Sequence, residues 1–454
     1  MPASQSKPEL VISSIAGMLL TMKENLSRRA LLQAGALAYP FLFIPRLRAV
    51  DPWESNQVIQ KSRRAALAVL KPSAAQLDRG LKLHAESLIF DTYSFAPRCA
   101  VDGEALAKMA KENASAIEIQ DARERMMMVR CVDNAEEREE FAQAWKASGV
   151  TCVFQNAGEE GQAPLRLIKR LANFTYVTDH LKGFLNKAAT PVDIEAAKKA
   201  GQHCLYFTGN GVPLTQQWIS VPDELRYLMV FRNLGMRMLH LTYNRRNMIG
   251  DGCAEPGNAG LSDFGKSVIK EMNRLGVIPD CAHSGWQTSF EAAKTSGKPV
   301  VASHSCAADL HKHIRGKPDK VLKAIADTDG LTGIACIPSF LGNPGDINAF
   351  LNHIDHVVKV TNINHVGIGT DTTYFSRNQS KEAAKIPKLP RSRTAWRYFW
   401  PPGSLRPQPQ ARLSIAWTNW PLFTVGLVQR GYKDEEIRKI IGGNMMRVCR
   451  ESLA

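Results

Sequence analysis

The chain has 454 residues, 44% of them hydrophobic and 22% charged, and a formal net charge of +15. This length can bury a large core, and the composition excludes a disordered or fibrous protein. The Lys and Arg residues are spread along the chain without zinc-finger spacing or an RNA-binding signature. The charge therefore indicates a solvated surface, and no nucleic-acid partner is expected.

The first 49 residues carry a targeting pattern. Arg28 and Arg29 directly precede an apolar run over 34–44, which is too short to cross a bilayer and is flanked like the apolar part of a signal peptide. We predict that residues 1–49 are a twin-arginine export signal and that residues 50–454 form one large domain in the periplasm. An amphipathic first helix is the alternative. No other segment is long enough for a transmembrane helix.

Short apolar runs alternate with helical patterns along the rest of the chain. Eight runs are candidate buried strands, at 87–91, 149–154, 203–208, 236–243, 276–283, 299–304, 331–337 and 365–371. Helical patterns cover 133–148, 223–234, 262–275, 286–294, 318–327, 347–361, 419–430 and 434–449. Eight alternating β and α elements predict an α/β fold, a single (β/α)8 TIM-type barrel. A doubly wound sheet is the runner-up, although no Gly-rich phosphate loop follows the first strand.

Two histidines end consecutive predicted strands. His283 is followed by Ser284, and His304 is followed by Ser305. Side chains at the carboxyl ends of neighbouring parallel strands point into the mouth of a barrel, where α/β enzymes keep their chemistry. One histidine at a strand end is more often structural, but two at equivalent ends favour a functional site.

An irregular stretch over 372–412 follows the eighth predicted strand. It contains six prolines and nine Lys or Arg residues against one Glu, and its aromatic residues include Trp396 and Trp400. A long loop at the active face of a barrel is usually a lid or a substrate wall. We predict that this basic loop suits an anionic or aromatic partner, and a plain solvated loop is an equal alternative.

Five stretches of the sequence resemble those of a known family. They are 241–247, 260–265, 271–283, 303–305 with Arg315 downstream, and 366–371. In these residues, their order and their spacing, the chain resembles the membrane (renal-type) dipeptidases, peptidase family M19, over roughly residues 86–450. The resemblance implies a metallo-dependent hydrolase barrel with two zinc ions at its mouth and hydrolysis of dipeptides through a metal-activated water.

The resemblance also assigns site residues. His283 and His304 match zinc ligands at the ends of strands five and six, and Asp371 matches the general acid/base. Arg315 matches the arginine that pairs with the substrate carboxylate, a task suited to its planar fork. Tyr243 stands where the family has a histidine that helps to bind substrate.

Three family zinc ligands are replaced. Tyr93 falls where the family has His, Phe95 where it has Asp, and Thr208 where it has the bridging Glu. Two dications need a negative bridging ligand, and two neutral imidazoles cannot hold them. We therefore expect no metal. In that case His283, His304 and Asp371 are predicted as catalytic residues that orient a ligand or shuttle protons, with Arg315 as the anion anchor. Tyr93 and Thr208 become part of the ligand-binding surface.

Two alternatives keep a metal in the predicted site. One is a lone zinc ion on His283, His304 and Asp371. The other is a working metallodipeptidase that uses substitute ligands, for which Asp91, His311 and His313 are the candidates.

The chain resembles one subgroup of the family in its export signal, its scaffold and its missing ligands. This subgroup is the periplasmic dipeptidase-like proteins of pyoverdine maturation in fluorescent pseudomonads. That resemblance implies binding of a peptide-derived siderophore precursor and support for oxidation of the ferribactin chromophore, without peptide-bond cleavage. Other periplasmic maturation enzymes are the implied protein partners. Hydrolysis of dipeptides is the alternative function, and a purely structural role is a third.

Overall fold

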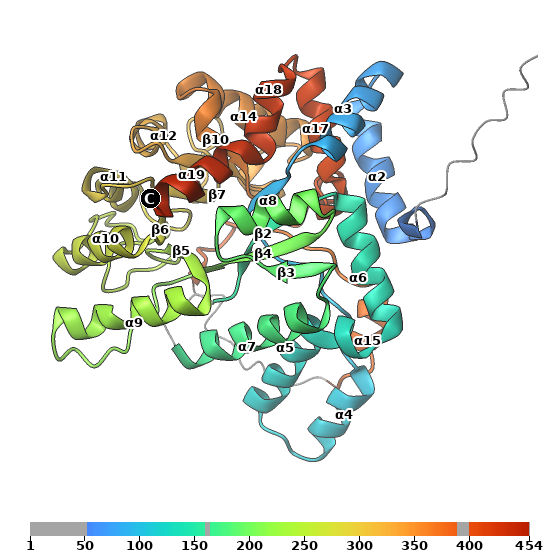
Figure 1. The fold of residues 1–454 in the computed structure, drawn as a ribbon, viewed down its shortest axis with the longest axis horizontal. Coiled ribbons are helices and arrows are strands. Elements are labelled where there is room, and N and C mark those ends of the chain that lie inside the picture. The colour runs from blue at the N-terminus through green and yellow to red at the C-terminus, as the bar shows by residue number, and fades with distance from the viewer. Residues whose placement is uncertain (1–51, 159–163, 388–398, 454) are drawn as a thin grey trace, which may run out of the picture. The chain divides into compact units, whose positions relative to one another are not determined.

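Eight parallel strands follow one another around the barrel (Figure 1). In order of pairing they are β1 (Phe90–Ser94), β2 (Cys152–Asn156), β4 (His203–Gly209), β5 (Met236–His240), β6 (Ile278–Asp280), β7 (Val301–Ala307), β9 (Leu331–Ile334) and β10 (Val366–Ile368). Each overlaps a predicted strand, which confirms the predicted TIM-type fold. Beyond β10, the Asp371 N–H donates to the Tyr93 carbonyl at 3.0 Å, which joins the last strand to the first.

The computed structural model describes residues 52–158, 164–387 and 399–453. The predicted signal over 1–49 lies outside these residues. One compact unit spans Asp51–Ala454. None of the helices in the described ranges is both long and apolar enough to cross a membrane.

Helices surround the strands in Figure 1. They are α2 (Gln57–Leu70), α3 (Ala74–Glu86), α4 (Gly103–Lys111), α5 (Ala116–Asp133), α6 (Ala135–Ser148), α7 (Pro164–His180), α8 (Pro191–Lys199), α9 (Val221–Leu234), α10 (Asp263–Leu275), α11 (Trp286–Thr295), α12 (Asp319–Ala326), α13 (Pro338–Leu341), α14 (Ile347–Val360), α15 (Gln379–Ala383), α16 (Pro409–Ser414), α17 (Trp420–Gln429), α18 (Asp434–Arg438) and α19 (Asn444–Leu453). Two short strands, β3 (Leu185–Lys187) and β8 (Gly316–Lys317), pair with β4 and β7.

Local signals explain the helix ends beside the site. Ser262 caps α10 by accepting a hydrogen bond from the N–H of Gly265, as its position before the helical pattern predicts. Gly276 ends the same helix with a positive φ of 68°, a conformation that glycine adopts without a steric penalty. The chain then enters β6 directly, so the length of α10 sets where His283 emerges.

Four strands, β5, β6, β9 and β10, end earlier than predicted, and the first two of them bear on the site. β6 ends at Asp280 rather than His283, because the Asp280 carboxylate accepts the N–H of Ala282 at 2.8 Å and turns the chain. β5 ends at His240 rather than Tyr243. His283 and Tyr243 therefore lie on loops at the barrel mouth, and His240 lies at the end of the sheet itself.

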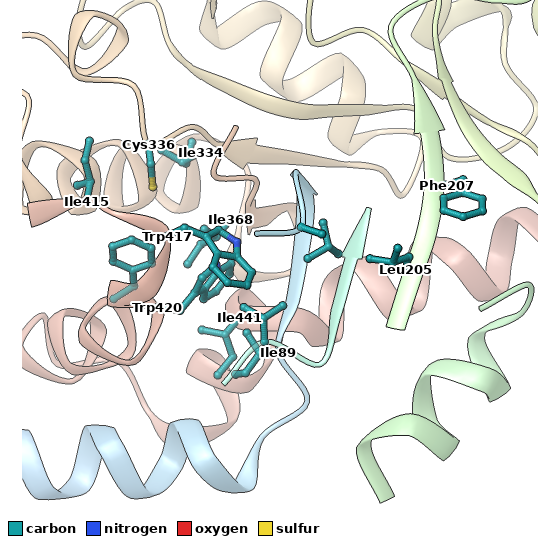
Figure 2. Packing of buried hydrophobic residues seen from close by; sticks show 14 of the residues in the cluster. Ile89, Leu205, Phe207, Ile334, Cys336, Ile368, Ile415, Trp417, Trp420 and Ile441 are labelled. Atoms are coloured by element: carbon teal, nitrogen blue, oxygen red, sulfur yellow. The ribbon is translucent and has the colours of Figure 1, made fainter. Parts of the chain in front are cut away.

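Residues near the C-terminus pack against the first and last strands of the barrel. Trp417 and Trp420 pack beside Ile368 and Ile89 in the apolar cluster of Figure 2. Both indole N–H groups donate to the Asp91 carboxylate of β1 at 3.2 Å. This buried carboxylate thus ties the first strand to a segment more than 300 residues later.

The basic loop over 372–412 is described in two parts, on either side of residues 388–398, which lie outside the described ranges. Its first part is anchored to α6, because the Tyr374 hydroxyl and the Arg377 N–H both donate to the Glu140 carboxylate. Its second part returns toward the barrel mouth, where Trp400 stacks on Phe340 with ring centroids 6.2 Å apart.

Candidate functional site

A cavity of about 800 Å³ lies at the carboxyl ends of the strands. Its aromatic walls are Tyr93, Phe95, Tyr243, Phe340 and Trp400. Its lining also includes four arginines, Arg98, Arg170, Arg406 and Arg412. Among the described residues that line the cavity, Asp371 is the one carboxylate. The lining is therefore basic and aromatic, and the volume lies in the upper part of the range for small-molecule sites.

The structure gathers the predicted site residues in two layers. Tyr93, Tyr243, His283 and Asp371 line the cavity. The other three predicted residues, Thr208, His304 and Arg315, are fully buried and are not part of the described cavity lining. The basic loop supplies part of the wall through Trp400, Arg406 and Arg412.

His283 and His304 face each other through their Nε2 atoms, which lie 3.1 Å apart. Nδ1 of His283 lies 2.6 Å from Oδ1 of Asn244, and Nδ1 of His304 lies 2.8 Å from Oγ of Ser303. Burial lowers the pKa of both histidines well below the usual value, and the Arg315 guanidinium lowers it further. Both imidazoles are therefore neutral at physiological pH, the form in which histidine binds metals or accepts a proton.

Tyr93 lies over this histidine pair. Its ring stacks on His304 with centroids 3.7 Å apart, and its hydroxyl donates to the Asn210 side chain at 2.6 Å. Thr208, the other residue predicted at a former ligand position, is buried in β4, and its hydroxyl has no hydrogen-bond partner among the residues described. An aromatic ring and a hydroxyl thus occupy the positions that the sequence comparison assigned to charged or imidazole ligands.

Arg315 is a fully buried cation beside the site. One Nη2–H donates to the His304 carbonyl at 2.9 Å, and the guanidinium lies 5.1 Å from the ring centre of Phe340. Its Nε and Nη1 have no hydrogen-bond partner within 52–158, 164–387 and 399–453. A buried guanidinium that leaves donors unused is well suited to an anionic ligand, since such donors are costly to bury unpaired.

Asp371 has an unusual environment and backbone. Burial raises the pKa of its carboxyl to about 7, against the opposing effect of Arg315, and Asp91 raises it further. Its φ is +53°, in the left-handed region that favours Gly, Asn and Asp. An acid with a pKa near 7 can give or take a proton at physiological pH.

The three proposed substitute ligands lie elsewhere. Asp91 accepts hydrogen bonds from Thr370, Trp417 and Trp420, so its oxygens are already engaged. His313 lies 2.9 Å from the Ser404 carbonyl through Nε2, and its Nδ1 accepts the Arg315 N–H. His311 packs against Gly342. The structure does not place any of the three in the cavity lining described.

A third histidine was missed from the sequence. His240 is fully buried, and its ring centre lies 5.3 Å from that of His283 and 5.2 Å from that of His304. Together His240, Asp280 and His304 offer ligand atoms that all lie within 4.8 Å of one another, so this trio could hold a metal ion. Like the other two histidines, His240 lies at the end of a strand, which is the pattern that marks a site residue. The predicted strand over 236–243 placed it in the strand interior instead.

Comparison with known proteins shows a match to one protein family. Residues 82–390 match the family model "Membrane dipeptidase (Peptidase family M19)". A curated relative, dipeptidase tcpJ of Claviceps purpurea, is 29% identical over 230 residues, which are 49% of this chain and 46% of the relative. The chain thus aligns with about half the length of that relative.

Solved structures show the same fold. An amidohydrolase from Pseudomonas aeruginosa has a TM-score of 0.59 at 23% identity, covering 82% of this chain and 99% of that one. The probable dipeptidase PvdM from Pseudomonas aeruginosa has a TM-score of 0.60 at 18% identity, covering 84% and 98%. The match to the family model over most of the barrel settles the family: the chain belongs to the membrane dipeptidases of peptidase family M19.

Proposed function

We propose that this M19 protein binds an anionic, peptide-like ligand in the barrel mouth without the binuclear zinc chemistry of its family. The observation that carries the proposal is Tyr93, which stands in place of a family ligand and stacks on His304 at 3.7 Å. A ring in that position offers no nitrogen to a zinc ion. Phe95 and Thr208, at the other two former ligand positions, supply no carboxylate.

A pair of zinc ions does not fit the remaining donors. His283 and His304 are neutral imidazoles, and Asp371 is half protonated near pH 7. Two dications close together repel strongly and need a bridging anion, which the threonine at position 208 cannot provide. We therefore derive no hydrolytic step through a binuclear centre.

The cavity supports a ligand larger than a dipeptide. Its volume of about 800 Å³ approaches the upper limit for drug-sized ligands. Arg315, which is not part of the described lining but lies 5.1 Å from the ring centre of Phe340 in it, is the proposed anchor for a carboxylate. Trp400, Phe340 and Tyr243 provide flat apolar surface for an aromatic group. Asp371 can exchange a proton with the bound ligand because its pKa is about 7.

Calorimetric titration with a short acidic peptide and with its C-terminal amide tests the proposed binding. We expect the acid to bind at least tenfold more tightly than the amide, and Arg315→Met to abolish that difference. Chromatography of the same mixtures should show an intact peptide. Equal affinities for acid and amide would contradict the proposed anchor.

A working metallodipeptidase is the second candidate, favoured by the retention of His283, His304 and Asp371 at one barrel mouth. It predicts zinc-dependent turnover of dipeptides by the purified protein. Turnover that rises with added zinc to two ions per chain would replace our first proposal with this one.

We further propose a periplasmic role in maturing a peptide siderophore of the pyoverdine type. In this role the protein binds the ferribactin precursor and presents it to a separate periplasmic oxidising enzyme. The export pattern at Arg28 and Arg29, together with the altered ligand positions, supports this assignment.

Two cellular experiments test the siderophore role. Replacing Arg28 and Arg29 by Lys should retain the protein in the cytoplasm, as shown by cell fractionation. In a pyoverdine producer that lacks its own dipeptidase-like maturation protein, the wild-type chain should restore pyoverdine fluorescence and Arg315→Met should not. Restoration by the lysine variant in the cytoplasm would contradict the periplasmic role.

A further inference from the structure

A second polar cluster lies among the barrel strands. His240 ends β5, Asp280 ends β6 and His304 lies in β7, so three consecutive strands each contribute one side chain. All three side chains are fully buried, and their ligand atoms lie within 4.8 Å of one another. The role proposed for the cavity does not use His240 or Asp280.

The contact between His240 and Asp280 leaves part of this cluster without a partner. Nε2 of His240 lies 2.7 Å from Oδ2 of Asp280, which is a close contact. The other ring nitrogen, Nδ1, has no hydrogen-bond partner in the described part of the chain. A buried polar atom without a partner is costly to the folded state, and a bound ligand would remove that cost.

Neighbouring groups also orient the donors. The Ser303 hydroxyl donates to Asp280 Oδ2 and lies 2.8 Å from Nδ1 of His304. Oδ1 of Asp280 accepts the N–H groups of Ala282 and Ser303 at 2.8 and 3.1 Å. Such supporting contacts fix ligand orientation in metal sites.

We propose that His240, Asp280 and His304 bind a single divalent transition-metal ion. Two imidazoles and one carboxylate suit Zn²⁺, Co²⁺ and Fe²⁺, and the last is common at two-histidine, one-carboxylate sites. Asp280 supplies the negative charge that offsets part of the charge of the ion. His240 thus provides a donor that does not come from any of the five family ligand positions identified in the sequence.

This site differs from an ion on His283, His304 and Asp371. The Tyr93 ring, which lines the cavity together with Asp371, stacks on the His304 ring. Its centre lies 5.2 Å from the centre of the His240 ring. The two arrangements share His304 but use different carboxylates, Asp280 or Asp371. The proposed site is also independent of which ligand the cavity takes.

Metal content and cobalt spectroscopy test the proposal. The protein is stripped with a chelator, titrated with Co²⁺ and followed by its visible absorption. We expect one Co²⁺ per chain, and at least a tenfold loss of affinity in His240→Gln and Asp280→Asn. Asp371→Asn is the matched control and should keep wild-type affinity.

X-ray absorption of the Co²⁺-loaded wild-type protein should show two imidazole ligands, a result that does not depend on the folding of any variant. The His240→Gln, Asp280→Asn and Asp371→Asn variants then separate this site from an ion on His283, His304 and Asp371. Circular dichroism shows whether each variant folds. The proposal fails if the wild-type protein binds no Co²⁺, or if folded His240→Gln keeps its affinity while Asp371→Asn loses it.

Discussion

Nε2 of His283 lies 3.1 Å from Nε2 of His304, and a proton on either nitrogen would make this contact a hydrogen bond. The partner at the opposite nitrogen decides which ring carries which proton. For His283 that partner is the amide oxygen of Asn244, 2.6 Å from Nδ1. The chemistry of the pair therefore depends on a side chain that is not part of the cavity lining described.

Replacing Asn244 by Asp should favour the charged form of the His283 imidazole. A carboxylate beside Nδ1 stabilises the protonated ring, so the pKa of His283 should rise by about 1 to 3. Histidine NMR titration measures this. Cys253→Ala is the control, because it removes the other side-chain contact of Asn244 and leaves the amide in place. An unchanged pKa in Asn244→Asp would show that Nδ1 does not face this side chain.

Asp371→Asn should flatten the pH dependence of stability. The folded carboxyl has a pKa of about 7 against 3.8 as the ordinary value, so between these pH values the folded chain binds more protons than the unfolded chain. The free energy of unfolding therefore falls as pH rises from about 4 to 7, by up to about 4 kcal/mol from this group. Denaturant unfolding across that range should show a smaller fall in Asp371→Asn than in the wild-type protein.

The backbone at this position provides the control. Asn tolerates the φ of +53°, whereas Ala in Asp371→Ala pays a strain of about 1 kcal/mol at every pH. The two variants should thus share the flattened pH profile and differ by a constant offset. Equal slopes in the wild-type protein and both variants would mean that Asp371 ionises normally.

Arg315→Met should weaken ligand binding without weakening the fold. The guanidinium is fully buried, and its Nε and Nη1 have no hydrogen-bond partner among the described residues, so its charge is costly to the folded state. We expect the free energy of unfolding to stay the same or to rise by about 1–3 kcal/mol. Arg412→Met, at the exposed rim of the cavity, should change it by less than about 0.5 kcal/mol. A large loss of stability in Arg315→Met would indicate a structural role.

Gly369→Ala should destabilise the barrel where its last strand meets β7. A Cβ at this position would lie 1.9 Å from the Ser303 carbonyl oxygen, which also accepts the Thr92 hydroxyl at 2.6 Å. Relief of that clash requires a backbone shift next to His304, at a cost of about 1–3 kcal/mol or more. Thermal unfolding measures the effect. Gly297→Ala is the control, since its Cβ would meet a single atom at 3.8 Å.

The basic loop over 372–412 shows what amino-acid composition can and cannot predict about the cavity wall. Its charge and aromatic residues predict a wall for an anionic or aromatic partner, and the structure places Trp400 and Arg412 in the cavity lining. Composition could not assign individual residues, because which side chains turn toward the barrel depends on distant anchors. Glu140 of α6 is one of these, holding Tyr374 and Arg377.

The sequence alone determined the order of the eight strands, since each is a local apolar run followed by a helical pattern. It also located His283, His304, Asp371 and Arg315, whose motifs are contiguous and specific. Only the tertiary structure brought His240 beside Asp280 and His304, because strand pairing joins positions that lie 40 and 64 residues from His240. Burial also lowers the pKa of His304, and burial is a property of the packed barrel that no single segment carries.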